Sequence, residues 1–595
     1  MKNFSQQTPV SSQSNGHAAS FMMTHRVCVV LAAIMIGQSI TLWKGCEYSS
    51  PTPDEAAHLL AGIEYWQTGK TSLYNVNPPL TKIWSTLPCV LRDRFVIPRP
   101  ESGGWRDPSA RQEFELGMLF AEQQPEFEEL LKSSRRMCAC FAVLGTLGVF
   151  YLASSLLSGN LGLIAAVLWA YLPLTLGHGA LLSADIPAAA MGCWMVVAAR
   201  GAFARPTLRA WSTIGVLIGL SILTKFTWLI VLPLWPLVVL LHEYYGSSNR
   251  RTVQNRCKEL FIRIMLVWFI AWAIICTGYR WQGVLTPIGD YKFVSALMRG
   301  DSDNRFAQGW LTSIPSVLPE NMIRGLDQQW QDFDEPRLAY LNGEWKIGGW
   351  WDYYLWALAY KLPIGLLVLI AVGTFISRGN RALLVATLFP TIALLTLISS
   401  KMNMNEHVRY VWVVVPFLCV LAASAFRVRN MMLRLSASLC MLWCTASGLW
   451  SFPCGVAHMN ELAGLLNREC PLAGSANDWS NDWYSIREWL RHFEAEAIAL
   501  HGTYPVSLRA SGIKTELATP RSIEEQLDAN TNVQVTLVMT VNTRLSLQRK
   551  LGFPSPMQQR NAEKRFCCTE VYSLPIDQVV RIPGIVWYAN AKNEK

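Results

Sequence analysis

A Thr-Pro-Asp-Glu turn, Thr52 to Glu55, directly follows the first apolar segment of the chain. Its carboxylates, Asp54 and Glu55, therefore stand at a membrane surface in a chain that otherwise contains long apolar runs. Desolvation of polar groups near a bilayer is costly, so acidic residues kept there call for a function. Carboxylates in such a place could accept a proton from a substrate or hold a metal ion.

The same turn also has the composition of a helix start. Thr52 suits the N-cap, Pro53 the first helical position, and Glu55 completes a capping box. The helix dipole favours Asp54 in the first turn but does not require aspartate there. Helical spacing puts Asp54 and His58 on one face. We therefore expect Asp54 to be the catalytic carboxylate, with His58 and Glu55 as substrate contacts, and capping as the structural alternative for Glu55.

Further charged residues recur beside apolar segments. Lys82 follows a Pro78-Pro79 pair and could either snorkel to the interface or hold a phosphate. Asp185 precedes Ile-Pro and could cap a helix, share catalysis with Asp54 or bind a divalent metal. Lys225 and Arg409 could be interface anchors or contacts to an anionic headgroup.

The bulk composition excludes several classes of protein. Of 595 residues, 51% are hydrophobic and 16% charged, which is too apolar for a soluble multidomain protein. The net charge of +10 comes from short Lys and Arg clusters between apolar spans. Such clusters orient membrane helices, so we expect a lipid bilayer and no nucleic acid as partner. The 15 cysteines form no CxxC pair typical of a metal cluster.

A membrane helix needs roughly 17 to 25 apolar residues, and eleven apolar segments of the chain come close to that length. We therefore predict an all-α polytopic membrane protein of about 11 transmembrane helices. The predicted spans are 27–43, 137–157, 160–176, 185–203, 211–224, 226–242, 260–279, 352–376, 382–399, 410–427 and 431–452.

The basic clusters give these spans an orientation. They follow the even-numbered spans, which places those loops in the cytoplasm. The opposite face then receives the five charged residues of interest: Asp54, Lys82, Asp185, Lys225 and Arg409. An acidic pair beside cations and an apolar groove would suit a lipid with an anionic head.

The same topology predicts three parts of the chain. Residues 1–26 form a disordered cytoplasmic N-terminus, and residues 27–452 a transmembrane domain with outer loops 44–136 and 280–351. Leu80 to Leu91 reads as an interfacial helix in the first loop. Residues 453–595 form a small extracytoplasmic α/β domain, with strands at 533–541 and 571–574 and a helix at 485–499.

Taken in order, these residues resemble the polyprenyl-phosphate-sugar-dependent glycosyltransferases of the GT-C class. The likeness is greatest to the glycosyltransferase family 39-like group of protein O-mannosyltransferases and aminoarabinose transferases. The matching pieces are Asp54-Glu55, Pro78-Pro79-Leu80 with Lys82, Ala184-Asp185-Ile186-Pro187, Thr224-Lys225-Phe226, Gly343-Glu344, Lys361-Leu362-Pro363, Arg409-Tyr410 and Asn460-Glu461-Leu462-Ala463-Gly464.

The resemblance implies a sugar transfer on the outer face of the inner or plasma membrane. The donor would be a polyprenyl-phosphate sugar, and the acceptor a hydroxyl of a protein, glycan or lipid. By matching position, Asp54 is expected to be the base and Asp185 the second acid, with Lys82, Lys225 and Arg409 on the donor phosphate. Asn77 departs from the pattern, because many relatives have His before the Pro-Pro pair.

Two other functions fit parts of the sequence. A transporter or flippase for lipid-linked sugars would also need a groove and cations, but it predicts charges at mid-span, where this chain has almost none. A non-catalytic membrane scaffold would leave Asp54 and Asp185 far apart, beyond any shared ligand.

Overall fold

The computed structural model describes most of the apolar part of the chain and the strands of its tail. The described residues are 24–99, 111–246, 253–301, 303–400, 403, 405–465, 470–477, 479–480, 482–492, 497–501, 515–518, 534–540, 549, 564–565, 569–575 and 586–590. The predicted disordered start lies outside them, except for residues 24–26, of which His25 and Arg26 already belong to the first helix.

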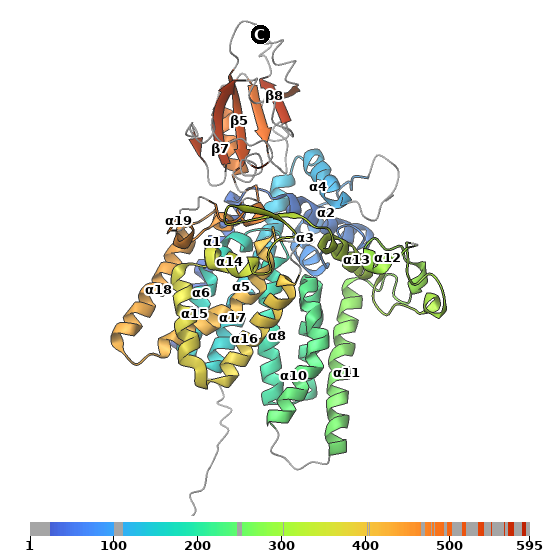
Figure 1. Ribbon diagram of the computed structural model, residues 1–595, viewed down its shortest axis with the longest axis vertical. Helices are drawn as coiled ribbons and strands as arrows, with labels where there is room; N and C mark the ends of the chain where they lie inside the picture. The colour runs from blue at the N-terminus through green and yellow to red at the C-terminus, as the bar shows by residue number, and fades with distance from the viewer. Residues whose placement is uncertain are drawn as a thin grey trace, which may run out of the picture.

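Long apolar helices lie side by side and form the lower part of the molecule (Figure 1). They are α1 (His25–Tyr48), α5 (Phe127–Leu156), α6 (Gly159–Ala170), α8 (Asp185–Ala204), α9 (Leu208–Thr224), α10 (Val231–Gly246), α11 (Val253–Gly278), α15 (Ile364–Ile376), α16 (Arg381–Ser399), α17 (Val415–Ala423) and α18 (Met431–Trp450). Short 3-10 turns join several of them: η1 (Phe226–Ile230), η4 (Ser377–Gly379), η6 (Val408–Val414) and η7 (Ser424–Arg427).

This bundle makes the chain a polytopic, mostly helical membrane protein. Within the described residues, eight helices are long and apolar enough to cross a membrane, or up to ten if each of two bent pairs is one span. Each of the eleven predicted segments contains a helix, but 211–224 is only the shorter apolar helix α9.

Two of the predicted spans are each made of two helices with a bend between them. Segment 160–176 bends by 58° between α6 and α7 (Pro173–Gly179), and segment 352–376 turns by 113° between α14 (Tyr353–Lys361) and α15. A proline begins the second piece of the first pair, and Pro363 is the N-cap of α15. Proline lacks the amide proton and disfavours helix in the residue before it, so the apolar run continues while the helix does not.

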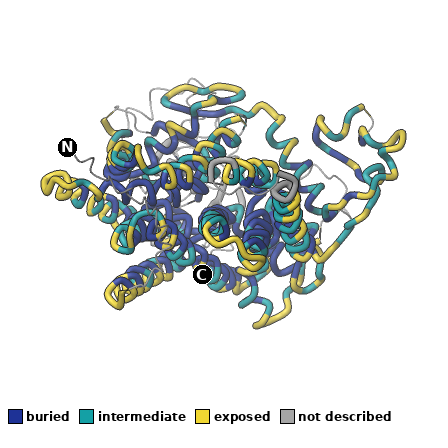
Figure 2. The backbone as a smooth tube through the Cα atoms, turned by 90° about the horizontal axis from the view of Figure 1, so that it is seen from below, coloured by how far each residue is buried: buried dark blue, intermediate teal, exposed yellow. Residues whose placement is uncertain are grey.

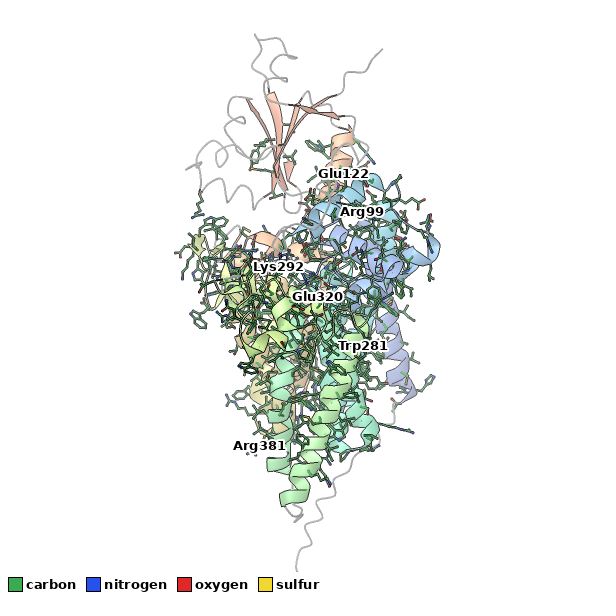
Figure 3. All side chains as sticks on the ribbon, turned by 90° about the vertical axis from the view of Figure 1, so that its right-hand side faces the viewer. Arg99, Glu122, Trp281, Lys292, Glu320 and Arg381 are labelled. Carbon is green, nitrogen blue, oxygen red and sulfur yellow. The ribbon has the colours of Figure 1, made fainter. Side chains whose placement is uncertain are left out.

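The burial pattern fits this arrangement. Helix α17 lies at the centre and is buried along its whole length, whereas α1, α11 and α18 are largely exposed on their outer faces. Figure 2 shows the buried backbone inside and the exposed helices around it. Figure 3 places Arg381, in a predicted cytoplasmic loop, at the end of the bundle opposite Lys292 and Glu320 of the second outer loop.

A layer of shorter elements covers the other end of the bundle (Figure 1). The first outer loop contributes α2 (Pro53–Thr68), α3 (Leu80–Arg92) and α4 (Gln112–Gln123). The second contributes η2 (Ile288–Asp290), α12 (Ala296–Arg299), η3 (Trp310–Ser313), α13 (Glu320–Asp334) and the hairpin β1 (Leu338–Leu341) with β2 (Glu344–Ile347). Helix α3 buries small polar residues such as Thr81 and Ser85 and exposes Trp84 and Leu91, as expected of an interfacial helix.

The tail adds a six-stranded sheet beyond this layer, with strand order β4-β8-β3-β5-β7-β6. Before it come η8 (Gly455–Ala457), α19 (Glu461–Leu465), η9 (Gly474–Ala476) and α20 (Trp483–His492). The strands are β3 (Ala497–His501), β4 (Thr515–Ala518), β5 (Gln534–Thr540), β6 (Lys564–Arg565), β7 (Thr569–Pro575) and β8 (Val586–Asn590). Of the described pairs, only β3 with β5 is parallel.

The tail confirms the two predicted strands, which correspond to β5 and β7, but shortens the predicted helix. Helix α20 ends at His492, and residues 497–499, predicted to be helical, belong to β3. Strand β3 pairs with β5 on one side and β8 on the other. These ladder hydrogen bonds outweigh the helical preference of its alanines.

Candidate active site

The Thr-Pro-Asp-Glu turn begins helix α2, as the capping pattern predicts. Thr52 is the extended N-cap residue, Pro53 opens the helix, and Glu55 Oε2 accepts a hydrogen bond from the Thr52 amide at 2.9 Å. Asp54 stands in the first turn, where the helix dipole favours its negative charge. The turn therefore fixes the backbone that presents Asp54.

Glu55 has structural contacts that go beyond the capping box predicted from the sequence. It is fully buried and forms a two-point ion pair with Arg135 of α5, with N–O distances of 2.7 and 2.6 Å. Its Oε1 also accepts the Leu182 amide at 2.7 Å, three residues before Asp185. These contacts favour the structural alternative for Glu55, and its assignment to substrate binding stays a prediction.

Arg135 extends this connection to the end of α1. Its guanidinium also donates to the carbonyls of Ser49 at 2.6 Å and Ser50 at 2.9 Å, and more weakly to Cys46 at 3.3 Å. One buried cation therefore joins three segments: the end of α1, the start of α2 and, through Glu55, the turn before α8. The starts of α2 and α8, which carry Asp54 and Asp185, are held at a fixed spacing.

Asp54 forms an ion pair with Arg409 of η6, with its Oδ2 at 2.9 Å from Nη2. The face of the Arg409 guanidinium lies 4.0 Å from the ring centre of Trp479, which comes from the tail. The carboxylate of Asp54 remains 16% exposed, so it stays within reach of a substrate. Two outer segments that are distant in sequence thus meet at one carboxylate.

A second ion pair adjoins the first. Asp185, the first residue of α8, accepts a hydrogen bond from Lys225 Nζ at 2.6 Å, and both side chains are less than a tenth exposed. Lys225 also lies 4.5 Å from the ring centre of Tyr410, the neighbour of Arg409. Lys225 ends helix α9 as its C-cap residue, which explains why a charge stands at the end of this apolar helix.

Arg409 interacts with both carboxylates. Besides its ion pair with Asp54, it is close enough to Asp185 for a favourable electrostatic interaction. Its Nη1 is buried and has no hydrogen-bond partner among the described residues. A buried guanidinium with an unused donor is suited to bind one more anionic oxygen, as in a phosphate.

His58 and Lys82 lie beside this cluster but contact other groups. The His58 ring is buried against Tyr74, with 4.6 Å between ring centres, and burial lowers the pKa of His58 to about 3. Lys82 donates to the carbonyls of Tyr74 and Asn77 at 2.8 Å each. Burial lowers the pKa of Lys82 to about 7. In these contacts Lys82 stabilises the turn before α3, and binding a phosphate would require it to leave that turn.

The structure thus joins four of the seven candidate residues, Asp54, Asp185, Lys225 and Arg409, in one cluster. Among the described residues, no three His, Cys, Asp or Glu side chains gather to hold a metal ion. The sequence predicted no role at this site for Arg135 or for Trp479. The Arg135-Arg136 pair lies at the end of a span that was predicted to face outward. Arginines are expected mainly at the cytoplasmic ends of spans, so this exception could have indicated a buried acidic partner.

A comparison with known families identifies the segment that carries half of this cluster. Residues 127–275 match the dolichyl-phosphate-mannose-protein mannosyltransferase family. The matched stretch runs from the start of α5 to near the end of α11 and contains Arg135, Asp185 and Lys225. It agrees with the resemblance found in the sequence, over about a quarter of the chain.

Solved structures match the chain at low sequence identity and with TM-scores below 0.5. ArnT from Cupriavidus metallidurans bound to undecaprenyl phosphate is 12% identical and has a TM-score of 0.43, covering 96% of this chain and 99% of its own. Its apo form has 14% identity and a TM-score of 0.44, with coverages of 92% and 97%. The Archaeoglobus fulgidus oligosaccharyltransferase in its apo form has 12% identity, a TM-score of 0.42 and coverages of 88% and 71%. No curated protein matches the chain.

Proposed function

We propose that this protein transfers a hexose or pentose from a polyprenyl-phosphate donor to a hydroxyl group, on the outer face of the inner or plasma membrane. The observation that carries the proposal is the cluster of two carboxylates and two cations at the covered end of an apolar helical bundle. The family match over residues 127–275 supports the same chemistry. The acceptor is a hydroxyl of a protein, a glycan or a lipid.

Asp54 is the proposed general base. The acceptor oxygen attacks the anomeric carbon as the bond from that carbon to the phosphate oxygen breaks, and the hydroxyl proton passes to Asp54. A single displacement of this kind inverts the anomeric configuration. Asp54 suits the role better than Asp185, because Asp185 is 5% exposed and bound to Lys225 at 2.6 Å, whereas Asp54 is 16% exposed.

The leaving group is polyprenyl phosphate, whose negative charge grows as the bond breaks. Arg409 and Lys225 are the proposed cations that stabilise it, and the unused Nη1 of Arg409 is a donor ready for a phosphate oxygen. A phosphate at Arg409 would compete with Asp54 for the guanidinium. Donor binding would thereby loosen the Asp54–Arg409 ion pair and free the carboxylate for the acceptor.

A reconstituted assay tests this function. The purified chain is placed in vesicles with a polyprenyl-phosphate hexose or pentose and a mixture of hydroxyl acceptors, and free polyprenyl phosphate is measured. Release of polyprenyl phosphate matched by glycosylated acceptor supports the proposal. Movement of intact donor between leaflets without release would refute it in favour of a flippase. Glycans and glycoproteins from cells that lack the protein, compared by mass, then identify the acceptor.

A further inference from the structure

A groove of about 610 Å3 lies at the C-terminal end of α18, the end that is farthest from Arg434 in its first turn and from Arg427 and Arg429 just before the helix. One wall is a single face of α18, since Trp443, Ser447 and Trp450 follow helical spacing. The other wall is the returning segment from Phe452 to Glu461. The groove contains none of the four clustered residues of the candidate active site.

Two polar side chains of this groove, Glu461 and His458, are acceptors. Glu461 is the one residue with a formal charge among those that line it, and its Oε1 accepts the Trp443 indole N–H at 3.0 Å. His458 contributes a second acceptor, which follows from its neighbours. Ser451 donates its only hydroxyl proton to the Ser447 carbonyl at 2.7 Å, so its contact of 2.8 Å with His458 Nδ1 must use an N–H of the ring.

His458 Nε2 is then the unprotonated nitrogen of a neutral imidazole. It is buried and has no hydrogen-bond partner among the described residues. The ring is neutral at pH 7 because burial, together with the charge of Lys361, lowers the pKa of His458 to about 4. The groove therefore contains a carboxylate and a ring nitrogen that both need donors.

Two aromatic rings complete the arrangement. Trp450 is 92% exposed and Trp443 is 51% exposed. Tryptophan rings at the end of a membrane helix lie at the level of the lipid headgroups, which cover their faces. The face of an indole ring attracts a cation, and Glu461 adds a full negative charge beside it. Along the rest of α18, Leu442 and Leu449 are also exposed and offer an apolar surface to a lipid chain.

We propose that this groove binds an ethanolamine phospholipid, whose primary ammonium donates to Glu461 and His458 beside the faces of Trp443 and Trp450. The three N–H donors of such an ammonium match two acceptors with one left for water. Its acyl chains lie along the exposed face of α18. A choline headgroup has the same charge but no N–H, so it satisfies neither acceptor.

The groove is separated from the candidate active site by one turn of chain. Helix η8 (Gly455–Ala457) forms part of the groove, and its Val456 packs on the other side against Leu181 and Trp479. The Trp479 ring in turn packs against the Arg409 guanidinium. The lipid site is nevertheless distinct from the sugar-transfer site and does not depend on the proposed function.

Lipid competition tests the proposal on the full chain. The protein is taken from vesicles with equal amounts of phosphatidylethanolamine, phosphatidylcholine and phosphatidylglycerol, and the lipids it retains are counted by native mass spectrometry. We expect about threefold or greater enrichment of phosphatidylethanolamine over phosphatidylcholine, the scale of a partly exposed charge pair. Glu461→Gln should bring that ratio close to one, and Trp450→Ala should lower the amount of phosphatidylethanolamine that the protein retains.

Glu115→Gln is the matched control, because Glu115 is an exposed carboxylate on α4, away from the groove. It should leave the enrichment unchanged. Trp450 is exposed, so its replacement leaves the core intact and keeps the test valid if Glu461→Gln misfolds. Equal retention of the three lipids by the unchanged protein would overturn the proposal. So would enrichment that persists in Glu461→Gln, unchanged retention of phosphatidylethanolamine in Trp450→Ala, or a dimer without lipid that Trp450→Ala abolishes.

Discussion

Removal of the Arg135 guanidinium should destabilise this protein more than most single substitutions would. Arg135→Met removes five hydrogen bonds, two to Glu55 and three to the carbonyls of Cys46, Ser49 and Ser50. It also leaves the Glu55 carboxylate buried without its counter-charge. Breaking a buried ion pair by removing one partner costs about 3–5 kcal/mol, and we expect a loss in that range.

A double-mutant cycle isolates the pair. Glu55→Gln should also cost about 3 kcal/mol or more, because it leaves Arg135 as the uncompensated buried charge. The double variant should be less destabilised than the sum of the two single variants by about 2 kcal/mol, since each single change already breaks the same contact. The free energy of unfolding is measured by titration with a denaturing detergent, in micelles of one composition.

Arg92→Met is the control. Arg92 forms an ion pair of similar length with Glu126, at 2.9 Å, but the two side chains are 56% and 59% exposed. Its loss should cost less than about 1 kcal/mol. Strict additivity of Glu55→Gln and Arg135→Met, or a cost no larger than that of Arg92→Met, would refute the structural role given to the buried pair.

Three further predictions concern the cluster and its neighbours. Asp185→Asn leaves Lys225 buried without its carboxylate and should slow sugar transfer by about tenfold or more. The double variant with Lys225→Met should transfer sugar no more slowly than the slower of the two single variants. If the two rate losses multiply in the double variant, the pairing is contradicted. The unfolded chain holds a proton on Lys82 up to its ordinary pKa of 10.5, and the folded chain sheds it near 7. The free energy of unfolding should therefore rise between these pH values, by at most about 1.4 kcal/mol per unit. Lys82→Met should flatten that rise, and an equal rise in the variant would contradict the assignment. Folding lowers the pKa of His58 from 6.5 to about 3, so between these pH values only the unfolded chain binds the proton. The free energy of unfolding should therefore fall as the pH drops from 6.5 to about 3. His58→Phe should reduce that fall in the same titration.

The sequence predicted those parts of the structure in which one physical rule dominates. Apolar length located the helices of the bundle, and capping chemistry located the start of α2 at Pro53. The basic loops placed Asp54, Asp185, Lys225 and Arg409 on one side of the membrane, where the structure joins them. Their catalytic and phosphate-binding roles stay predictions.

The sequence was a poor guide where two rules compete or where the partner is distant. Apolar composition continues across Pro173 and Pro363, although the helices bend there. Ala497 and Ala499 favour helix locally but pair in a sheet. Glu55 satisfied its capping box, and nothing nearby indicated that Arg135 and Leu182 also bind its carboxylate. Contacts of that range depend on the packing of the whole bundle.

The central claim is that Asp54 accepts the acceptor's proton while Arg409 holds the donor phosphate. Donor binding and single-turnover transfer, measured side by side for Asp54→Asn, test it most directly. We expect the variant to bind the polyprenyl-phosphate sugar at least as tightly as the unchanged protein, because Arg409 loses its competing carboxylate, and to transfer sugar more than about a hundredfold more slowly. Normal turnover in Asp54→Asn, or loss of donor binding with turnover per bound donor intact, would contradict the account.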